Sequence, residues 1–402
     1  MSKAGSLLDW QLAQDRLLAA IAPAGTEQVP TQSASGRILA QAVIARRNQP
    51  AADLSAMDGY AVGAGDPTGP WQLVGESAAG HPFAGDLTAG RAVRISTGAL
   101  VPVGANAILL QENARIDGSQ LSTITGSKAE AKHIRRAGFD FAAGDTLLDA
   151  GTPLSPAALA LALMGGHGAV EVFRRPSLAI IDSGDELASD PAAALPHQIP
   201  SSNGPMLAAM AVPYVCAVER IGPVADNKAA LLAALETASA ADVIVTSGGA
   251  SVGEHDLVRP ALEEWGATID FWRIALKPGK PLMVARRGKT VVLGLPGNPV
   301  SSFVTAWLFL LPLLRRIGGH PAPAPQTVTR LVEADLPATG DRAEFLRGVA
   351  KADTVRTFDE QDSSALRVLS QANALIYRPP GSPALQAGSP VQVFLLQNGG
   401  IA

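Results

Sequence analysis

The sequence has very little cysteine. Its 402 residues include a single Cys, Cys216, so no disulfide can form within the chain and no cysteine cluster is available to bind zinc. The six histidines are scattered along the chain, without the close pairing on which His-based metal sites depend. Because Cys216 lies in the apolar run YVCAVERI, we expect an inert thiol in a buried strand.

The sequence also has no excess of positive charge. Its net charge is -4 and its pI is near 5.9, whereas a general nucleic-acid binder normally shows a basic excess. We therefore expect no nucleic-acid partner. Any site that binds an anion has to be a local concentration of basic groups.

No apolar run is long enough to predict a membrane helix. The most apolar late run, FVTAWLFLLPLL, is shorter than the roughly 18 residues of a spanning helix and contains Pro312. The N-terminal stretch SLLDWQLAQDRLLAAI contains Asp9, Asp15 and Arg16, and its apolar residues have helical spacing, which indicates an amphipathic helix and not a signal peptide. These patterns favour a cytoplasmic protein without a membrane anchor.

Glycine and proline are abundant, and they divide the chain into segments with different patterns of apolar residues. Forty Gly and 30 Pro cluster between apolar runs, as expected of strands and short helices joined by tight turns. We predict a multidomain α/β protein with four parts. These are a split helical N-terminal domain at 1–45 plus 143–175, an inserted β-rich module at 46–142, an α/β domain at 176–320 and a C-terminal β-barrel-like domain at 321–402. The two helical stretches that flank the β-rich module are expected to belong together.

Strand-like and helix-like runs alternate from about residue 177 to residue 317. Such alternation predicts a central three-layer α/β/α domain with a mostly parallel sheet. Sheets of this kind bind ligands beyond the carboxyl ends of their strands, and four polar or Gly-rich loops follow predicted strands here. They are IIDSGDELA, TSGGASVGEHD, LKPGKPLM and LPGNPVSSF.

The four loops offer complementary chemistry. Carboxylates in the first can hold Mg²⁺, and the glycines of the second let backbone amides approach a phosphate. Lys277 and Lys280 of the third are mobile positive charges, and the fourth opens a helix with Ser301 and Ser302 in its first turn. Each loop alone is also compatible with a simple turn, a helix cap or a solvated face. Together they predict an oxyanion or phosphate pocket.

The second loop also contains a G-x-S-x-G pattern, which suggests an alternative. Ser251 could be the nucleophile of a serine hydrolase, with His320 as a later base. That elbow requires a sharp turn directly from strand to helix, whereas a Gly pair intervenes here and the helix is expected to start near Asp256. The pattern therefore disfavours a hydrolase without excluding it.

Seven segments, in order along the chain, resemble those of a known family. They are SAMDGYAV, RAVRISTGALVPVGANAILLQE, SGDEL, SSNGPML, DVIVTSGGASVGEHD, KPGKPLM and GLPGNPVSSF. The sequence from about residue 7 to the C-terminus is similar to the bacterial molybdopterin molybdenumtransferases (MoeA, or molybdenum insertases), which are related to the gephyrin E domain. The resemblance implies four-domain subunits in an elongated homodimer. It also implies a reaction in which adenylylated molybdopterin and molybdate give molybdenum cofactor and AMP, with Mg²⁺ as the cofactor.

The resemblance and the loops together assign roles to individual residues. The catalytic candidates are Asp58, Asp140, Glu186, Asp226, Asp256, Lys277 and Lys280. The metal candidates are Asp185, Glu186 and Asp256. The substrate-binding candidates are Thr97, Ser183, Gly184, Asp185, Asn203, Ser247, Gly248, Gly249, Ser251, Gly253, Pro296, Gly297, Asn298, Pro299, Ser301, Arg342, Arg347 and Ser364. The resemblance further implies that Asp58 and Thr97 approach the pocket of the partner subunit, so that the active site is shared across the dimer. Molybdopterin adenylyltransferase and molybdoenzyme-maturation proteins are the other expected partners.

Three segments depart from the pattern of this family. The usual GED or GQD is GFD, which retains Asp140. The STGDEL segment is DSGDEL, which places Asp182 where the pattern has Ser, and the Asp usual before Ser-Asn is replaced by Ser201. A related single-domain family, the molybdopterin adenylyltransferases, shares the TSGG loop and is the second functional hypothesis. A peptide-binding scaffold like gephyrin E is a third.

Overall fold

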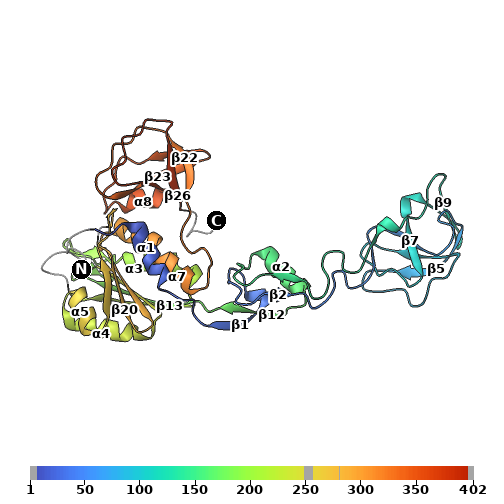
Figure 1. Cartoon of the computed structure of the whole chain (residues 1–402), viewed down its shortest axis with the longest axis horizontal. Helices are drawn as coiled ribbons and strands as arrows, with labels where there is room; N and C mark the ends of the chain where they lie inside the picture. The colour runs from blue at the N-terminus through green and yellow to red at the C-terminus, as the bar shows by residue number, and fades with distance from the viewer. Residues whose placement is uncertain (1–6, 249–256, 280, 397–402) are drawn as a thin grey trace. The chain divides into compact units, whose positions relative to one another are not determined.

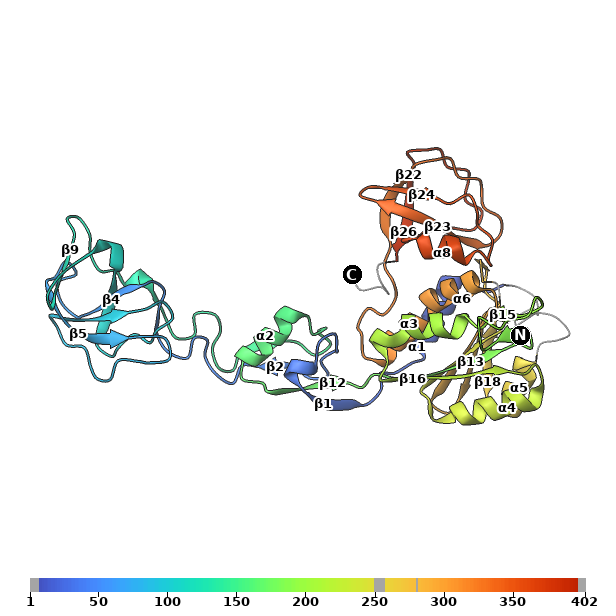
Figure 2. The same cartoon turned by 180° about the vertical axis from the view of Figure 1, so that it is seen from behind.

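The computed structural model describes residues 7–248, 257–279 and 281–396. These form two compact units, unit 1 from residues 1–27 and 173–402 and unit 2 from residues 28–172 (Figures 1 and 2). The candidates Gly249, Ser251, Gly253, Asp256 and Lys280, among them the hydrolase nucleophile candidate Ser251, lie outside the described residues.

A six-stranded sheet dominates unit 2, with strand order β7-β4-β6-β5-β9-β8. Its strands are β4 (Gly59–Gly63), β5 (Trp71–Ser77), β6 (Arg91–Ile95), β7 (Ala105–Leu110), β8 (Ala114–Asp117) and β9 (Gln120–Thr123). Alternate side chains of a strand point to opposite faces. Accordingly, Tyr60 and Val62 of β4 join one core cluster while Ala61 joins the other.

The rest of unit 2 contains one α-helix, α2 (Pro156–Met164), and several short elements. The Oγ of Ser155 caps α2 by accepting a hydrogen bond from the N–H of Ala158 at 3.2 Å, and Pro156 occupies the first turn. The short strands pair as β2 (Val43–Ile44) with β11 (Thr146–Leu148), β3 (Leu54–Ser55) with β10 (Ile134–Arg135), and β1 (Thr26–Pro30) with β12 (Ala169–Phe173). The 3₁₀ turns are η1 (Thr31–Ser33), η2 (Gln111–Asn113) and η3 (Ala131–His133).

The N-terminal helix α1 (Trp10–Ala19) packs within unit 1. Its buried Trp10, Ala13 and Leu17 belong to a core of unit 1, whereas Ala158 and Ala162 of α2 belong to a core of unit 2. The four-domain division, with these two flanking helices in one domain, therefore stays a prediction. Helical periodicity marks the buried face of α1 but does not identify the partner of that face.

The α/β part of unit 1 has the predicted three layers (Figure 1). Its six-stranded sheet has the order β16-β13-β17-β21-β20-β18. The first four strands are parallel, namely β13 (Ser177–Ser183), β16 (Ala217–Val224), β17 (Val243–Ser247) and β21 (Thr290–Leu295). Two antiparallel strands, β20 (Met283–Arg287) and β18 (Thr268–Trp272), complete it. The sheet is thus mostly parallel, as expected.

Helices cover both faces of this sheet. On one face lie α4 (Lys228–Thr237) and α5 (Val258–Glu264), with η5 (Ala238–Ala240). On the other lie α1, α3 (Asn203–Ala211) with η4 (Val212–Tyr214), and a continuous helical run made of α6 (Pro299–Thr305), η6 (Ala306–Leu310) and α7 (Leu311–Ile317). This run is the one helix among the described residues that is long and apolar enough to cross a membrane, and 83% of the window tested is buried within the fold, as in a core helix.

The C-terminal part of unit 1 is a closed barrel of five strands, which agrees with the predicted barrel-like domain. The strands are β22 (Val328–Val332), β23 (Ala343–Lys351), β24 (Thr354–Thr357), β25 (Ala374–Arg378) and β26 (Pro390–Leu395), and α8 (Leu366–Gln371) lies between β24 and β25 in the chain. Each strand pairs with two others in a ring. The two-residue strand β19 (Leu276–Lys277) of the α/β part pairs with β23 and so joins the two parts.

One expectation about the core is wrong. Cys216 is exposed, and it lies just before β16, an edge strand of the sheet none of whose residues is buried. Its neighbour Val215 points into the core and is 7% exposed.

Candidate functional site

A pocket of about 1010 Å³ lies at the carboxyl ends of the parallel strands of unit 1. In-register pairing brings these ends together, because Asp182 of β13 lies beside Ser247 of β17, which lies beside Leu295 of β21. The barrel contributes the remaining wall, with Arg342 and the loop from Gln361 to Ser364. The pocket thus occupies the place at which parallel α/β sheets bind ligands.

Most of the candidates described in unit 1 line this pocket. They are Ser183, Glu186, Asn203, Ser247, Gly248, Lys277, Pro296, Gly297, Asn298, Pro299, Ser301, Arg342, Arg347 and Ser364. Gly184, Asp185 and Asp226 do not line it. Asp185 and Asp226 instead contact each other, since Oδ1 of Asp185 accepts a hydrogen bond from the backbone N–H of Asp226 at 3.1 Å.

The candidates in unit 2 form a local feature of their own. Oδ1 of Asp58 accepts a hydrogen bond of 2.7 Å from the backbone N–H of Thr97. This bond joins the turn before β4 to the turn after β6. Asp140 follows the exposed Phe139, whose side chain is 75% exposed.

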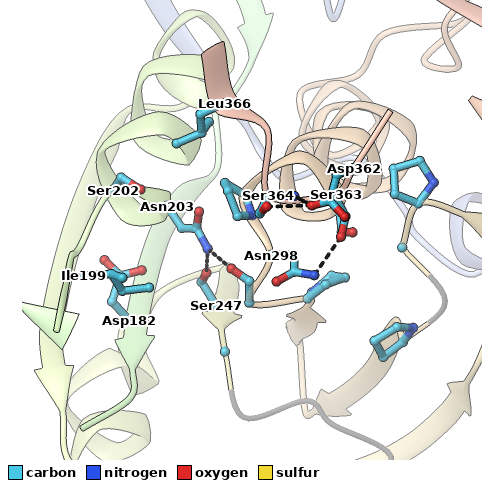
Figure 3. Close-up of a pocket in the computed structure, with 18 of the residues that line it drawn as sticks. Asp182, Ile199, Ser202, Asn203, Ser247, Asn298, Asp362, Ser363, Ser364 and Leu366 are labelled. Carbon is cyan, nitrogen blue, oxygen red and sulfur yellow. Dashed lines mark hydrogen bonds between the residues drawn. The ribbon is translucent and has the colours of Figure 1, made fainter. Parts of the chain in front are cut away.

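The amide of Asn203 joins two of the strand-end loops (Figure 3). Its Nδ2 donates to Oγ of Ser247 at 2.9 Å and to the carbonyl of Gly297 at 2.7 Å. Asn203 is the first residue of α3, so one side chain ties a helix start to the loops after β17 and β21. Its Oδ1 is buried and has no hydrogen-bond partner, which leaves an acceptor at the wall of the pocket.

The loop after β17 needs glycine at its first position. Gly248 has a φ of 95°, and a Cβ there would lie 2.4 Å from the carbonyl oxygen of Ser183. Residues other than glycine are strained at such φ values because they carry a Cβ. The TSGG sequence therefore permits the close approach of two strand-end loops, and it leaves the Gly248 backbone at the pocket wall.

Cationic side chains line the pocket where the barrel contributes to its wall. Nζ of Lys277 lies 3.0 Å from Oε1 of Glu344, an ion pair between β19 and the barrel. Arg342 lines the pocket, and within the described part of the chain it makes no ion pair. Arg347 is 1% exposed and donates to the carbonyl of Asp362 at 2.9 Å. Burial lowers the pKa of its guanidinium, while the nearby Glu360 and Asp362 raise it.

Several pocket residues were not assigned from the sequence. Asp182, Ser201, Ser202, Gln361, Asp362 and Ser363 all line the pocket. Burial raises the pKa of Asp182, although hydrogen bonds from Ser201 and Gly204 and the charge of Arg220 oppose this. Hydrogen bonds from Ser364 lower the pKa of Asp362. The polar run QDSS could have indicated the barrel loop. Its contact with the strand-end loop could not be predicted, because Nδ2 of Asn298 donates to Oγ of Ser363, 65 residues away, at 2.8 Å.

The donor atoms at the strand ends fit Mg²⁺ held jointly with substrate phosphates. Mg²⁺ prefers oxygen ligands and is usually held by one or two carboxylates together with phosphates. Glu186 lines the pocket, and Oγ of Ser183 is buried without a partner. In residues 7–248, 257–279 and 281–396, no three Asp, Glu, His or Cys side chains cluster closely enough to hold a metal by themselves. The described residues therefore fit a metal that arrives with its substrate.

Family comparisons cover nearly the whole chain. Residues 8–166 match the MoeA N-terminal region (domain I and II), residues 179–316 a probable molybdopterin binding domain, and residues 330–396 the MoeA C-terminal region (domain IV). Molybdopterin molybdenumtransferase 2 of Mycobacterium tuberculosis is 36% identical over 384 residues, which cover 91% of this chain and 94% of the relative. The molybdopterin molybdenumtransferase of Haemophilus influenzae is 35% identical over 81% of each chain.

A solved structure gives the same result at the level of the fold. A molybdopterin biosynthesis MoeA protein from Pyrococcus horikoshii superposes with a TM-score of 0.83 at 27% identity, covering 98% of this chain and all of that one. Sequence and fold agree along the same length. The chain therefore belongs to the MoeA family.

Proposed function

We propose that this protein is a molybdopterin molybdenumtransferase, which converts adenylylated molybdopterin and molybdate into molybdenum cofactor and AMP. The observation that carries the proposal is the composition of the pocket. Positive side chains, Lys277 and Arg342, share it with buried oxygen acceptors at the strand ends, within a chain matched by all three MoeA regions. The activity named for the relatives requires the binding of such an anionic, hydrogen-bonding substrate.

The roles of the residues follow from the chemistry of a phosphoanhydride. Its cleavage requires mainly positioning and neutralisation of charge. Lys277 and Arg342 would neutralise the phosphate and molybdate oxygens, and the hydroxyl of Ser301 would donate to them. Glu186 would hold Mg²⁺, which supplies further neutralisation at the phosphates. Asn203 keeps the loops at Ser247 and Gly297 in place around the substrate.

We also propose a cytoplasmic homodimer with shared active sites. In that arrangement Asp58, Thr97 and Asp140 of unit 2 would serve the pocket of the partner. The support in this chain is the ordered Asp58–Thr97 turn and the exposure of Met57, Leu100 and Phe139, which are 40%, 38% and 75% exposed. Light scattering after gel filtration tests the mass, and a monomer at working concentration would contradict the dimer. Molybdopterin adenylyltransferase and molybdoenzyme-maturation proteins would supply the substrate and receive the product.

The activity test uses the purified protein with adenylylated molybdopterin, Mg²⁺ and molybdate. AMP release and cofactor formation are expected, and both should fall strongly in Arg342→Ala. Arg356→Ala is the matched control, because Arg356 is an exposed barrel arginine that does not line the pocket. Consumption of ATP and free molybdopterin without AMP release from the adenylylated substrate would indicate the adenylyltransferase instead. Omitting Mg²⁺ tests the metal requirement.

A further inference from the structure

Two helices begin at the wall of the pocket. One is α3, which starts at Asn203, and the other is the helical run that starts at Pro299. The first turn of a helix presents unpaired N–H groups and a partial positive charge, which attract anions. Because the proposed substrates carry phosphate and oxyanion groups, a helix start with free N–H groups would attract them.

The start of α3 is already occupied by the carboxylate of Asp182. Its Oδ2 accepts hydrogen bonds from Oγ of Ser201 at 3.1 Å and from the backbone N–H of Gly204. A Cβ on Gly204 would lie 2.0 Å from this Oδ2, so the carboxylate sits directly against the first turn. The helix has no cap of its own, since Ser202 makes no side-chain capping bond and the first turn contains no acidic residue.

The start at Pro299 has no such carboxylate, but Pro299 has no N–H and the N–H of Val300 donates to the carbonyl of Ser363 at 3.0 Å. Asn298 makes no side-chain capping bond, and the first turn of α6 contains no acidic residue. Asp362 belongs to the barrel loop that contacts this start through Ser363, and it accepts hydrogen bonds from Ser364 within its own loop. Lys277 and Arg342 line the same pocket. The pocket therefore has a carboxylate at the start of α3 and positive side chains on the wall to which the barrel contributes.

We propose that Asp182 is a specificity-determining residue, whose carboxylate excludes anionic groups from the start of α3 and confines them to the wall with Lys277 and Arg342. The identity of the anions as substrate phosphate and molybdate rests on the proposed function. The charge pattern itself does not depend on the proposed function. Asp182 is 4% exposed, so its charge acts on the pocket with little screening by solvent.

The positions of Asp182 and Ser201 provide a matched control. Asp182 and Ser201 share a hydrogen bond of 3.1 Å, so exchanging the two residues would place the carboxylate at 201 and the hydroxyl at 182. One carboxylate and one hydroxyl are present in either arrangement. Exchanging the two residues should therefore keep a carboxylate at the start of α3.

The test measures binding of inorganic phosphate by equilibrium dialysis, with the full chain at pH 8 because burial raises the pKa of Asp182. Arg342→Ala provides a background with a weakened cationic wall. Adding Asp182→Ser to this background should tighten phosphate binding about fivefold, because a free helix start attracts an anion by about 1 kcal/mol. Adding Ser201→Asp as well should reverse the gain.

Two outcomes would overturn the proposal. One is a folded Asp182→Ser, Arg342→Ala protein that binds phosphate no better than Arg342→Ala. The other is an undiminished gain after Ser201→Asp is added. If Asp182→Ser fails to fold, Asp182→Asn in the same background carries the same expectation, since it removes the charge but keeps the shape. The measurement uses no molybdopterin, so a failure of the proposed enzymatic activity would show separately, as an absence of AMP release.

Discussion

The ammonium of Lys277 lies 3.0 Å from the carboxylate of Glu344, and this ion pair joins the α/β sheet to the barrel at the pocket. Register places Lys277, Glu344 and Arg378 in one row across β19, β23 and β25. Glu344 is thus the ion-pair partner of a pocket lysine. Burial lowers the pKa of Arg378, which is 2% exposed, and the charge of Glu344 opposes this by raising it. The Glu344 side chain is 15% exposed, whereas the Lys277 side chain is 53% exposed. The barrel therefore supplies the more buried member of this ion pair.

Replacing Glu344 with Gln should impair both substrate binding and stability. Lys277 loses its partner and becomes less well placed, and the buried Arg378 loses a neighbouring negative charge. We expect the KM for the adenylylated substrate to rise about fivefold. The free energy of unfolding should fall by about 1–3 kcal/mol, as when a hydrogen bond to a charged group is removed. Steady-state kinetics and thermal melting measure the two effects. Glu333→Gln, at an exposed barrel position bonded to Thr354, should change neither by as much.

Truncating Asn203 to Ala should release two of the loops that form the pocket. Ser247 and Gly297 would each lose a hydrogen bond from Nδ2, which costs about 1–3 kcal/mol where a buried partner remains unsatisfied. We expect a large rise in KM with a smaller fall in kcat. Asn227→Ala is the control, because Asn227 caps α4 by accepting from Ala230 at 2.9 Å and should lower stability by about 1 kcal/mol without changing KM. Equal kinetic effects in both variants would contradict the positioning role.

Trp10 should matter for the barrel as well as for α1. Its ring lies edge-on to Phe345, Tyr377 and Phe394, with centroid distances of 5.3, 5.6 and 6.3 Å. Trp10→Ala would leave a cavity among these rings and should destabilise unit 1 by about 3–5 kcal/mol. Urea unfolding followed by the fluorescence of the remaining tryptophans measures this. Trp71→Ala in unit 2 should destabilise that unit instead, and a Trp10→Ala protein as stable as the parent would contradict the packing argument.

The fold class and the place of the pocket could be predicted from the sequence because both depend on local patterns. Alternating strand and helix runs predict the parallel sheet, and the chain order of the loops then places them at one edge. The partner of α1 could not be predicted in this way, since its apolar stripe packs against residues such as Phe345 that lie far along the chain. The exposure of Cys216 was missed because the run YVCAVERI begins before β16 and because β16 is an unburied edge strand, which its apolar residues do not indicate.

The candidate site shows the same division between local and long-range information. The glycines, lysines and serines of the strand-end loops could be assigned to anion binding from the sequence alone. The hydrogen bond between Asp182 and Ser201 spans 19 residues, and the sequence shows the two substitutions only as separate departures. Their relationship depends on the fold, because β13 and the start of α3 meet in space. The sequence therefore predicts which residue types are available, whereas the fold determines which of them act together.

The stability of unit 1 should depend on pH through Asp242. This carboxylate accepts hydrogen bonds from Arg174 at 3.0 and 2.7 Å and from the N–H and Oγ of Ser177 at 2.7 and 2.9 Å. Burial raises the pKa of Asp242, but the hydrogen bonds and the charge of Arg174 outweigh it, so the pKa is lower than usual.

A carboxylate with a lowered pKa in the folded state stabilises the fold above its unfolded pKa of about 3.9. That contribution is lost as the pH falls through the folded-state value. Asp242→Asn should therefore be less stable than the parent by about 1–3 kcal/mol at pH 7, with the difference shrinking below about pH 4. Urea unfolding at pH 7 and pH 3 measures it. Asp66→Asn is the control, because Asp66 bonds to Thr68 at the fully exposed surface of unit 2 and should leave the unfolding of unit 1 unchanged at both pH values. A stability difference for Asp242→Asn that is the same at both would show that the carboxylate contributes shape rather than charge.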